Sequence, residues 1–298
     1  MRALPLLASL AAAVALLSLP LATRSAAREE TGAGTNAGTG CRGLSPAQAD
    51  RARSARLDEA VGELARRASG RAPAEQVEAL GALVSNMPCM DLENRANVSA
   101  AFLVDHVQDA LEARRAARAR GWNVPWSVFL DAAVPYAALS EPRDGFNARR
   151  ALRPFMSALV RPNATLEEAV VALNLRAWSF TAPPITFQAS SPNKVNAYSP
   201  REVIAAKHAS CTGESVFLVA ALRSVGVPAR VAGVPHWLKG PDVCPQGDAS
   251  PPCGNHNWVG TLLVLVGGEP RPRTDLDRSR RGSASTGPSW TRTAASPA

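Results

Sequence analysis

Residues 209–223 read ASCTGESVFLVAALR, a polar turn followed by an apolar run. This pattern predicts a helix that has Cys211 in its first turn and buries its later turns. The peptide N–H groups at the start of a helix stabilise negative charge, so a cysteine there favours the nucleophilic thiolate over the thiol. The sequence therefore predicts a reactive cysteine at the start of a buried helix.

A second residue of interest, His256, lies in residues 254–259, GNHNWV, at the head of an apolar, strand-like run. A cysteine on a helix start and a histidine on a later strand are two of the three groups of a thiol acyl-transfer site. Plainer interpretations exist, because a free cysteine is often an inert core residue and His256 could be an ordinary strand residue. Of the remaining histidines, His236 is interpreted as a packed residue, His208 as a surface residue, and His106 has no evident partner in the sequence.

The N-terminus has the features of a secretory signal peptide. Arg2 supplies positive charge, residues 4–21 are apolar, and residues 25–27 offer a small-residue cleavage site. An uncleaved membrane anchor is the alternative, and no other run approaches the ~20 apolar residues that cross a bilayer. We expect an exported protein, in an extracellular, periplasmic or secretory-pathway compartment, without a membrane segment beyond the signal peptide.

The formal net charge of +8 raises the question of nucleic-acid binding. The basic residues are almost all arginine, since the lysines are Lys194, Lys207 and Lys239. In a chain so rich in alanine and glycine this indicates a coding bias, and the arginines are scattered rather than gathered in a stripe. The sequence therefore predicts no nucleic-acid partner.

Five cysteines in an oxidising compartment suggest two disulfides and one free thiol. A bridge between Cys244 and Cys253 would close a Pro-rich loop just before the histidine. Cys41 and Cys89 would then pair across the N-terminal helices, which leaves Cys211 free; other pairings are compatible with the same count. Zinc bound by Cys244, Cys253 and the histidine is a further alternative, but the spacing fits no finger or ribbon pattern.

Secondary-structure signals change along the chain. Ser45-Pro46 and Ser199-Pro200 each read as an N-cap followed by proline at the first helical position, and Thr165 to Glu168 has the spacing of a capping box. Residues 229–237 and 258–266 read as strands. A series of helices, followed by the cysteine helix and antiparallel strands, predicts an α+β fold.

The residues also resemble the transglutaminase-like superfamily, whose core places Cys, His and Asp on a papain-like scaffold. The resemblance rests on Cys211-Thr-Gly-Glu-Ser, on residues 222–231 (LRSVGVPARV), and on Asn255-His-Asn-Trp-Val, and it covers about residues 120–266. It implies that the cysteine helix packs on an antiparallel sheet. Residues 129–136 also resemble the helical region that precedes the core in some members.

The resemblance and the composition together predict five segments. They are a signal peptide (1–27), a flexible lead-in (28–44), a helical region (45–120), a transglutaminase-like core (121–266) and a disordered or aberrant tail (267–298).

The third catalytic residue departs from the family pattern. After Trp258-Val259 no strand that carries an aspartate is recognisable, and the candidate orienting acids, Asp275 and Asp277, lie in an Arg-rich tail. We hypothesise that the sequence leaves the family's reading frame or exon structure near Val259. A continuous frame in a transcript sequenced across codons 259–268 would contradict this.

The resemblance implies thiol-dependent acyl transfer or amide hydrolysis on protein or peptide substrates, with Cys211 as nucleophile and His256 as base. This chemistry needs no metal or organic cofactor, and no acidic cluster suits calcium. One alternative is an inactive transglutaminase-like fold that binds peptides or glycans. Another is a truncated product that does not fold, because a missing strand leaves an open sheet edge.

Overall fold

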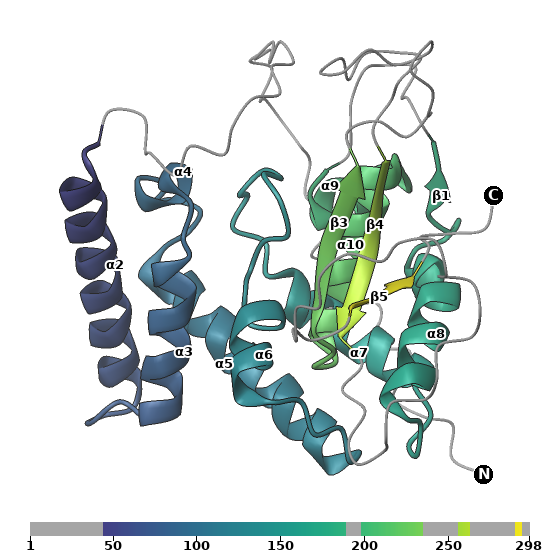
Figure 1. Cartoon of the computed structure of the whole chain (residues 1–298), viewed down its shortest axis with the longest axis horizontal. Coiled ribbons are helices and arrows are strands. Elements are labelled where there is room, and N and C mark those ends of the chain that lie inside the picture. Colours follow the sequence, from purple (N-terminus) through teal and green to yellow (C-terminus); the bar gives the residue numbers. More distant parts are fainter. Residues whose placement is uncertain (1–43, 189–197, 235–255, 263–289, 294–298) are drawn as a thin grey trace, which may run out of the picture. The chain divides into compact units, whose positions relative to one another are not determined.

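The computed structural model of this chain describes residues 44–188, 198–234, 256–262 and 290–293. These residues form an α+β structure, in which helices precede a small antiparallel sheet, as predicted (Figure 1). In chain order the elements are α2 (Pro46–Arg67), α3 (Ala74–Ser85), α4 (Cys89–Leu92), α5 (Ala100–Ala119), α6 (Trp126–Ala132), α7 (Ala148–Leu159), α8 (Leu166–Arg176), η1 (Ala177–Phe180), β1 (Thr186–Phe187), α9 (Pro200–Ala206), β2 (His208–Ala209), α10 (Cys211–Ser224), β3 (Ala229–Val234), β4 (His256–Leu262) and β5 (Trp290–Thr293).

The predicted helix starts are confirmed at α2, α8 and α9. Each has a capping box, in which the N-cap side chain and the side chain three residues later bond each other's backbone N–H. In α2 and α9, proline follows the cap because its fixed φ suits the first turn and its missing N–H would have no helical acceptor.

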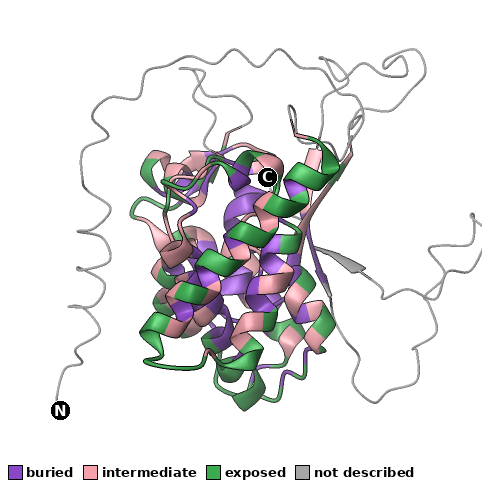
Figure 2. Cartoon of the chain, turned by 90° about the vertical axis from the view of Figure 1, so that its left-hand side faces the viewer, coloured by how far each residue is buried: buried purple, intermediate pink, exposed green. Residues whose placement is uncertain are grey.

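The N-terminal helices share one hydrophobic cluster. Leu64 of α2, Leu80 of α3 and Leu103 of α5 are completely or almost completely buried in it. Figure 2 shows the same arrangement, with buried surfaces between the helices and exposed ones on their outer faces. The cluster continues through Phe129 and Val134, so residues after 120 also pack with this helical region.

The sheet has the order β3-β4-β5 and is antiparallel throughout. Its first two strands lie along α10 (Figure 1). On the shared face, Ala229 is paired with Thr261 and Val231 with Val259, and Ala229, Val259 and Thr261 are buried. The cysteine helix therefore packs on an antiparallel sheet, as the sequence predicted.

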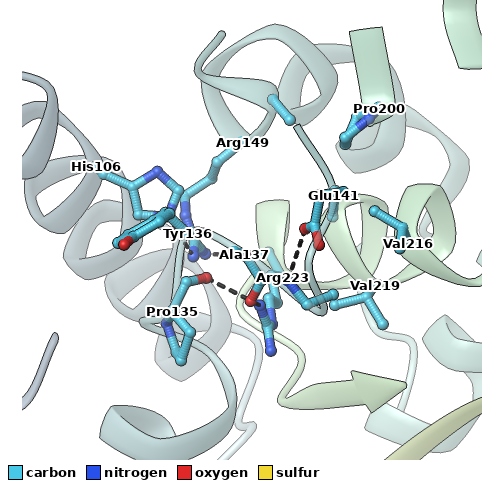
Figure 3. A pocket seen from close by; sticks show the side chains of 13 residues that line it. His106, Pro135, Tyr136, Ala137, Glu141, Arg149, Pro200, Val216, Val219 and Arg223 are labelled. Atoms are coloured by element: carbon cyan, nitrogen blue, oxygen red, sulfur yellow. Dashed lines mark hydrogen bonds between the residues drawn. The ribbon is translucent and has the colours of Figure 1, made fainter. Parts of the chain in front are cut away.

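Two buried arginines join the far end of α10 to the segment between α6 and α7. Arg223 of α10 donates from Nε and Nη1 to the backbone carbonyls of Ala132, Ala229, Pro135 and Ala137. Arg149 of α7 donates to the carbonyls of Arg223 and Ala133. Both side chains border a cavity of about 20 Å³ (Figure 3). The hydrogen bonds of Arg149 and Arg223 to backbone carbonyls therefore hold α10 against the segment that joins α6 to α7.

Strand β5 was not predicted. The composition of residues 267–298 predicts a disordered or aberrant tail, yet residues 290–293 pair with β4, from Leu262↔Trp290 to Val259↔Thr293. The short α4 and the two-residue parallel pair β1–β2 were also not foreseen. Among the residues that the structure describes, no helix is long and apolar enough to cross a membrane.

Candidate functional site

Cys211 is the first residue of α10, as predicted. Helix α9 ends at Ala206 and is capped by Lys207, which has a left-handed φ of 59°, and β2 then leads to the N-cap Ser210. Cys211 is half-buried and carries a free thiol. The cysteine therefore has the position and the accessibility that a nucleophile needs.

The approach to Cys211 is fixed by strand β2. Thr186 pairs with His208 and Phe187 with Ala209, and the backbone N–H of Gln188 donates to the carbonyl of Ala209 at 2.8 Å. Phe187 is 54 % exposed although it is a large apolar residue. Strand β1 therefore lies beside β2, the strand that precedes Cys211, and its Phe187 side chain is exposed to solvent there.

The first turn of α10 differs from those of α2, α8 and α9. Its N-cap Ser210 is extended, but the Ser210 side chain accepts no hydrogen bond from the helix. The N–H groups of a first turn have no intrahelical acceptor, so they stay available to an anion when no side chain caps them. An oxyanion that forms on a substrate bound at Cys211 would meet such donors.

His256 is the first residue of β4, where it pairs with Val234 of β3. It is half-buried, and its ring lies 6.1 Å from that of Trp258 on the same face of the strand. The histidine is therefore at the head of an apolar strand, as predicted.

The neighbours of the two predicted catalytic residues are hydrogen-bonded to each other. Asn257 Nδ2 donates to Thr212 Oγ1 at 2.6 Å, which joins the start of β4 to the first turn of α10. Successive side chains of a strand point to opposite faces. Since Asn257 faces α10, the His256 side chain leaves the strand on the other face. The structure thus brings the two elements together but gives the helix-facing position to Asn257.

Glu214 is a residue of this region that sequence reasoning missed. It lies one turn after Cys211 and is 2 % exposed, and burial raises the pKa of its carboxyl group to about 7. A glutamate in the first turn of a helix normally reads as a solvated residue that complements the helix dipole. No local signal in the sequence could have indicated its burial.

Most of the other predicted site and disulfide residues lie outside the part of the chain that the structure describes. Asp275 and Asp277 lie outside the described residues, and none of the four residues of β5 is acidic. Cys89 is not among the free thiols, while its predicted partner Cys41 and the Cys244–Cys253 pair lie outside the described residues. Both bridges stay predictions. In the described segments, no group of three or more His, Cys, Asp or Glu side chains could hold a metal ion.

Residues 159–267 match the family model described as transglutaminase-like superfamily. The match includes α10, β3 and β4, and with them Cys211 and His256. No curated protein and no solved structure matches the chain. The chain therefore carries a domain of the transglutaminase-like superfamily.

Proposed function

We propose that this domain catalyses thiol-dependent acyl transfer or amide hydrolysis on protein or peptide substrates. The Cys211 thiolate attacks a carboxamide or peptide carbonyl carbon, and the new C–S bond replaces the C–N bond. His256 receives the thiol proton, gives it to the leaving amine, and then activates water or a second amine that releases the acyl group.

The observation that carries this proposal is the free, half-buried thiol of Cys211 at an uncapped helix start, inside the segment that matches the superfamily. The thiol supplies the nucleophile, and the first-turn N–H groups supply oxyanion donors. The bond from Asn257 to Thr212 joins the head of β4, the strand that begins with His256, to this helix start. Transfer of the thiol proton requires the His256 ring to turn from the outer face of the strand toward Cys211.

The proposal is tested by trapping the acyl-enzyme. The protein is incubated with glutamine-containing peptides, quenched in acid and analysed by peptide mass spectrometry. We expect a thioester adduct on Cys211 that is absent in Cys211→Ala and that is both formed and released slowly in His256→Asn. Turnover that persists in Cys211→Ala would contradict the assignment of the nucleophile.

The second candidate is an inactive member of the fold that binds peptides or glycans. It is favoured by the helix-facing position of Asn257 and by the absence of an acid in β5. Here Cys211 would react with iodoacetamide as an ordinary thiol across a pH series, and peptide binding measured by calorimetry would be equal in wild type and Cys211→Ala.

We further propose that the protein is exported after cleavage near residue 27. N-terminal sequencing of protein recovered outside the cytoplasm tests this. A mature chain that begins near residue 28 is expected, and a chain that retains Met1 would contradict cleavage.

A further inference from the structure

A cleft of about 350 Å³ lies at the end of α10 that is remote from Cys211. Arg223, which lines it, is twelve residues after the cysteine, or about 18 Å along the helix axis. The cleft is also bordered by the end of α3 and the turn that follows it, by α6, and by the first residues of β3. It is therefore separate from the proposed catalytic site.

Arg223 brings to this cleft a positive charge that no carboxylate of the described residues contacts. The residue is 5 % exposed, and its Nε and Nη1 are taken up by four backbone carbonyls. The Nη2 atom of Arg223 has no acceptor among the described residues. This atom is not buried, so it remains in contact with solvent. A buried guanidinium without a contacting carboxylate is costly, and a ligand anion would offset that cost.

The other charged groups of the cleft are already paired. Arg143 donates to Asp91 Oδ2 at 3.0 Å, and Arg230 pairs with Asp131. Glu141, which acts electrostatically on Arg223, borders the smaller cavity instead, and its oxygens accept from the N–H groups of Ala138 and Leu139. Arg223 is thus the guanidinium that can take a new acceptor.

Apolar side chains form about half of the wall. Leu83, Met87, Leu130 and Val231 line it, and Leu139 lies at its edge with 40 % of its surface exposed. A volume near 350 Å³ lies in the range of small-molecule sites, which combine apolar walls with a few polar anchors.

We propose that this cleft binds a small ligand with an apolar body and one carboxylate, which accepts a hydrogen bond from Arg223. A free carboxylic acid and the carboxyl terminus of an apolar peptide share this chemistry. The structure favours an anion because the unpaired group is a cation, and it favours an apolar body because of the surrounding leucine, methionine and valine side chains.

Isothermal titration calorimetry with octanoate tests the proposal on the full chain, with octanamide as the neutral match. We expect octanoate to bind at least about tenfold more tightly, because a hydrogen bond to a charged group is the stronger one. N-acetyl-Ala-Leu with a free carboxylate separates the two sources, since tighter binding than octanoate would indicate a peptide terminus. Equal binding of octanoate and octanamide, or no binding of any carboxylate probe, would overturn the proposal.

Substitutions at exposed positions locate the binding without disturbing the core. Asn86 is exposed and lines the cleft, so Asn86→Asp places a negative charge beside the ligand. We expect it to weaken octanoate binding about fivefold, while Asn163→Asp, at an exposed position outside the cleft, leaves it unchanged. Equal affinities in the two variants would place the octanoate elsewhere and refute the assignment.

Discussion

Glu214 makes the stability of the fold depend on pH. Burial raises the pKa of its carboxyl group from the ordinary 4.5 to about 7, so the folded state holds a proton that the unfolded state releases between these values. The free energy of unfolding must then fall as the pH rises through this window. The carboxyl group thus destabilises the fold once it ionises.

The test compares urea unfolding at pH 5 and pH 8. From pH 5 to pH 8, we expect the free energy of unfolding of the wild type to fall by about 1–3 kcal/mol more than that of Glu214→Gln, because the amide cannot ionise. Glu167→Gln is the matched control, at an exposed first-turn position of α8. The assignment is wrong if wild type and Glu214→Gln lose the same stability.

Arg149 is a residue whose removal we expect to destabilise the fold severely. It is 2 % exposed, burial lowers the pKa of its guanidinium to about 9, and its hydrogen bonds satisfy carbonyls at the ends of α6 and α10. Arg149→Leu leaves these buried acceptors without donors, which costs about 3 kcal/mol or more.

The same unfolding measurement on Arg161→Ala gives the comparison. Arg161 is exposed and pairs with Glu168, so its loss is expected to cost less than about 1 kcal/mol. Similar losses in both variants would show that the buried hydrogen bonds of Arg149 contribute little to stability.

The sequence predicted where helices start, but it did not predict which side chains are buried or face the cysteine helix. Cys211 and the cap Thr165 were placed correctly, because a helix start is defined by neighbours in the chain. The burial of Glu214 and the helix-facing position of Asn257 depend on what packs against them from distant segments. Local patterns carry no information of that kind.

At the scale of elements, the turn from α10 to β3 depends on Gly226. Its φ is +89°, and an added Cβ would lie 2.7 Å from the carbonyl oxygen of Ala113 and 2.9 Å from Cβ of Ala117. Helix α5 thus packs directly on the glycine. We expect Gly226→Ala to destabilise the fold by about 2–4 kcal/mol, from the left-handed φ and the steric conflict together.

Gly62 provides the opposite case within α2. An added Cβ would meet nothing within 4 Å, so Gly62→Ala is expected to stabilise the protein by about 0.5–1 kcal/mol through its better helix propensity. Thermal unfolding of both variants checks the pair. A Gly226→Ala protein as stable as the wild type would mean that α5 does not hold this turn.

Strand β5 was the element that the sequence could not reveal. Residues 290–293 follow a long Arg-, Ser- and Pro-containing segment, and their strand character depends on pairing with β4. Strands β3 and β4 were easier to predict, because each contains a local run of residues that favour strands.

For the whole molecule, β5 determines whether β4 is a central strand or an edge strand of the sheet. It pairs with residues 259–262 of β4, so its removal opens backbone donors and acceptors on that strand. We expect a chain that ends at residue 289 to self-associate in size-exclusion chromatography, while a chain that ends at residue 293 elutes as the full-length protein does. Identical elution of the two would show that β5 is dispensable.

The contact between Gly233 and Asn257 couples two strands at one point. A Cβ at position 233 would collide with Asn257 Oδ1, so the carboxamide that reaches Thr212 has room only while its cross-strand partner lacks a side chain. Substitutions at the two positions should therefore compensate: a larger residue at 233 would be tolerated together with a smaller one at 257. In a set of natural relatives, these two columns would be expected to covary.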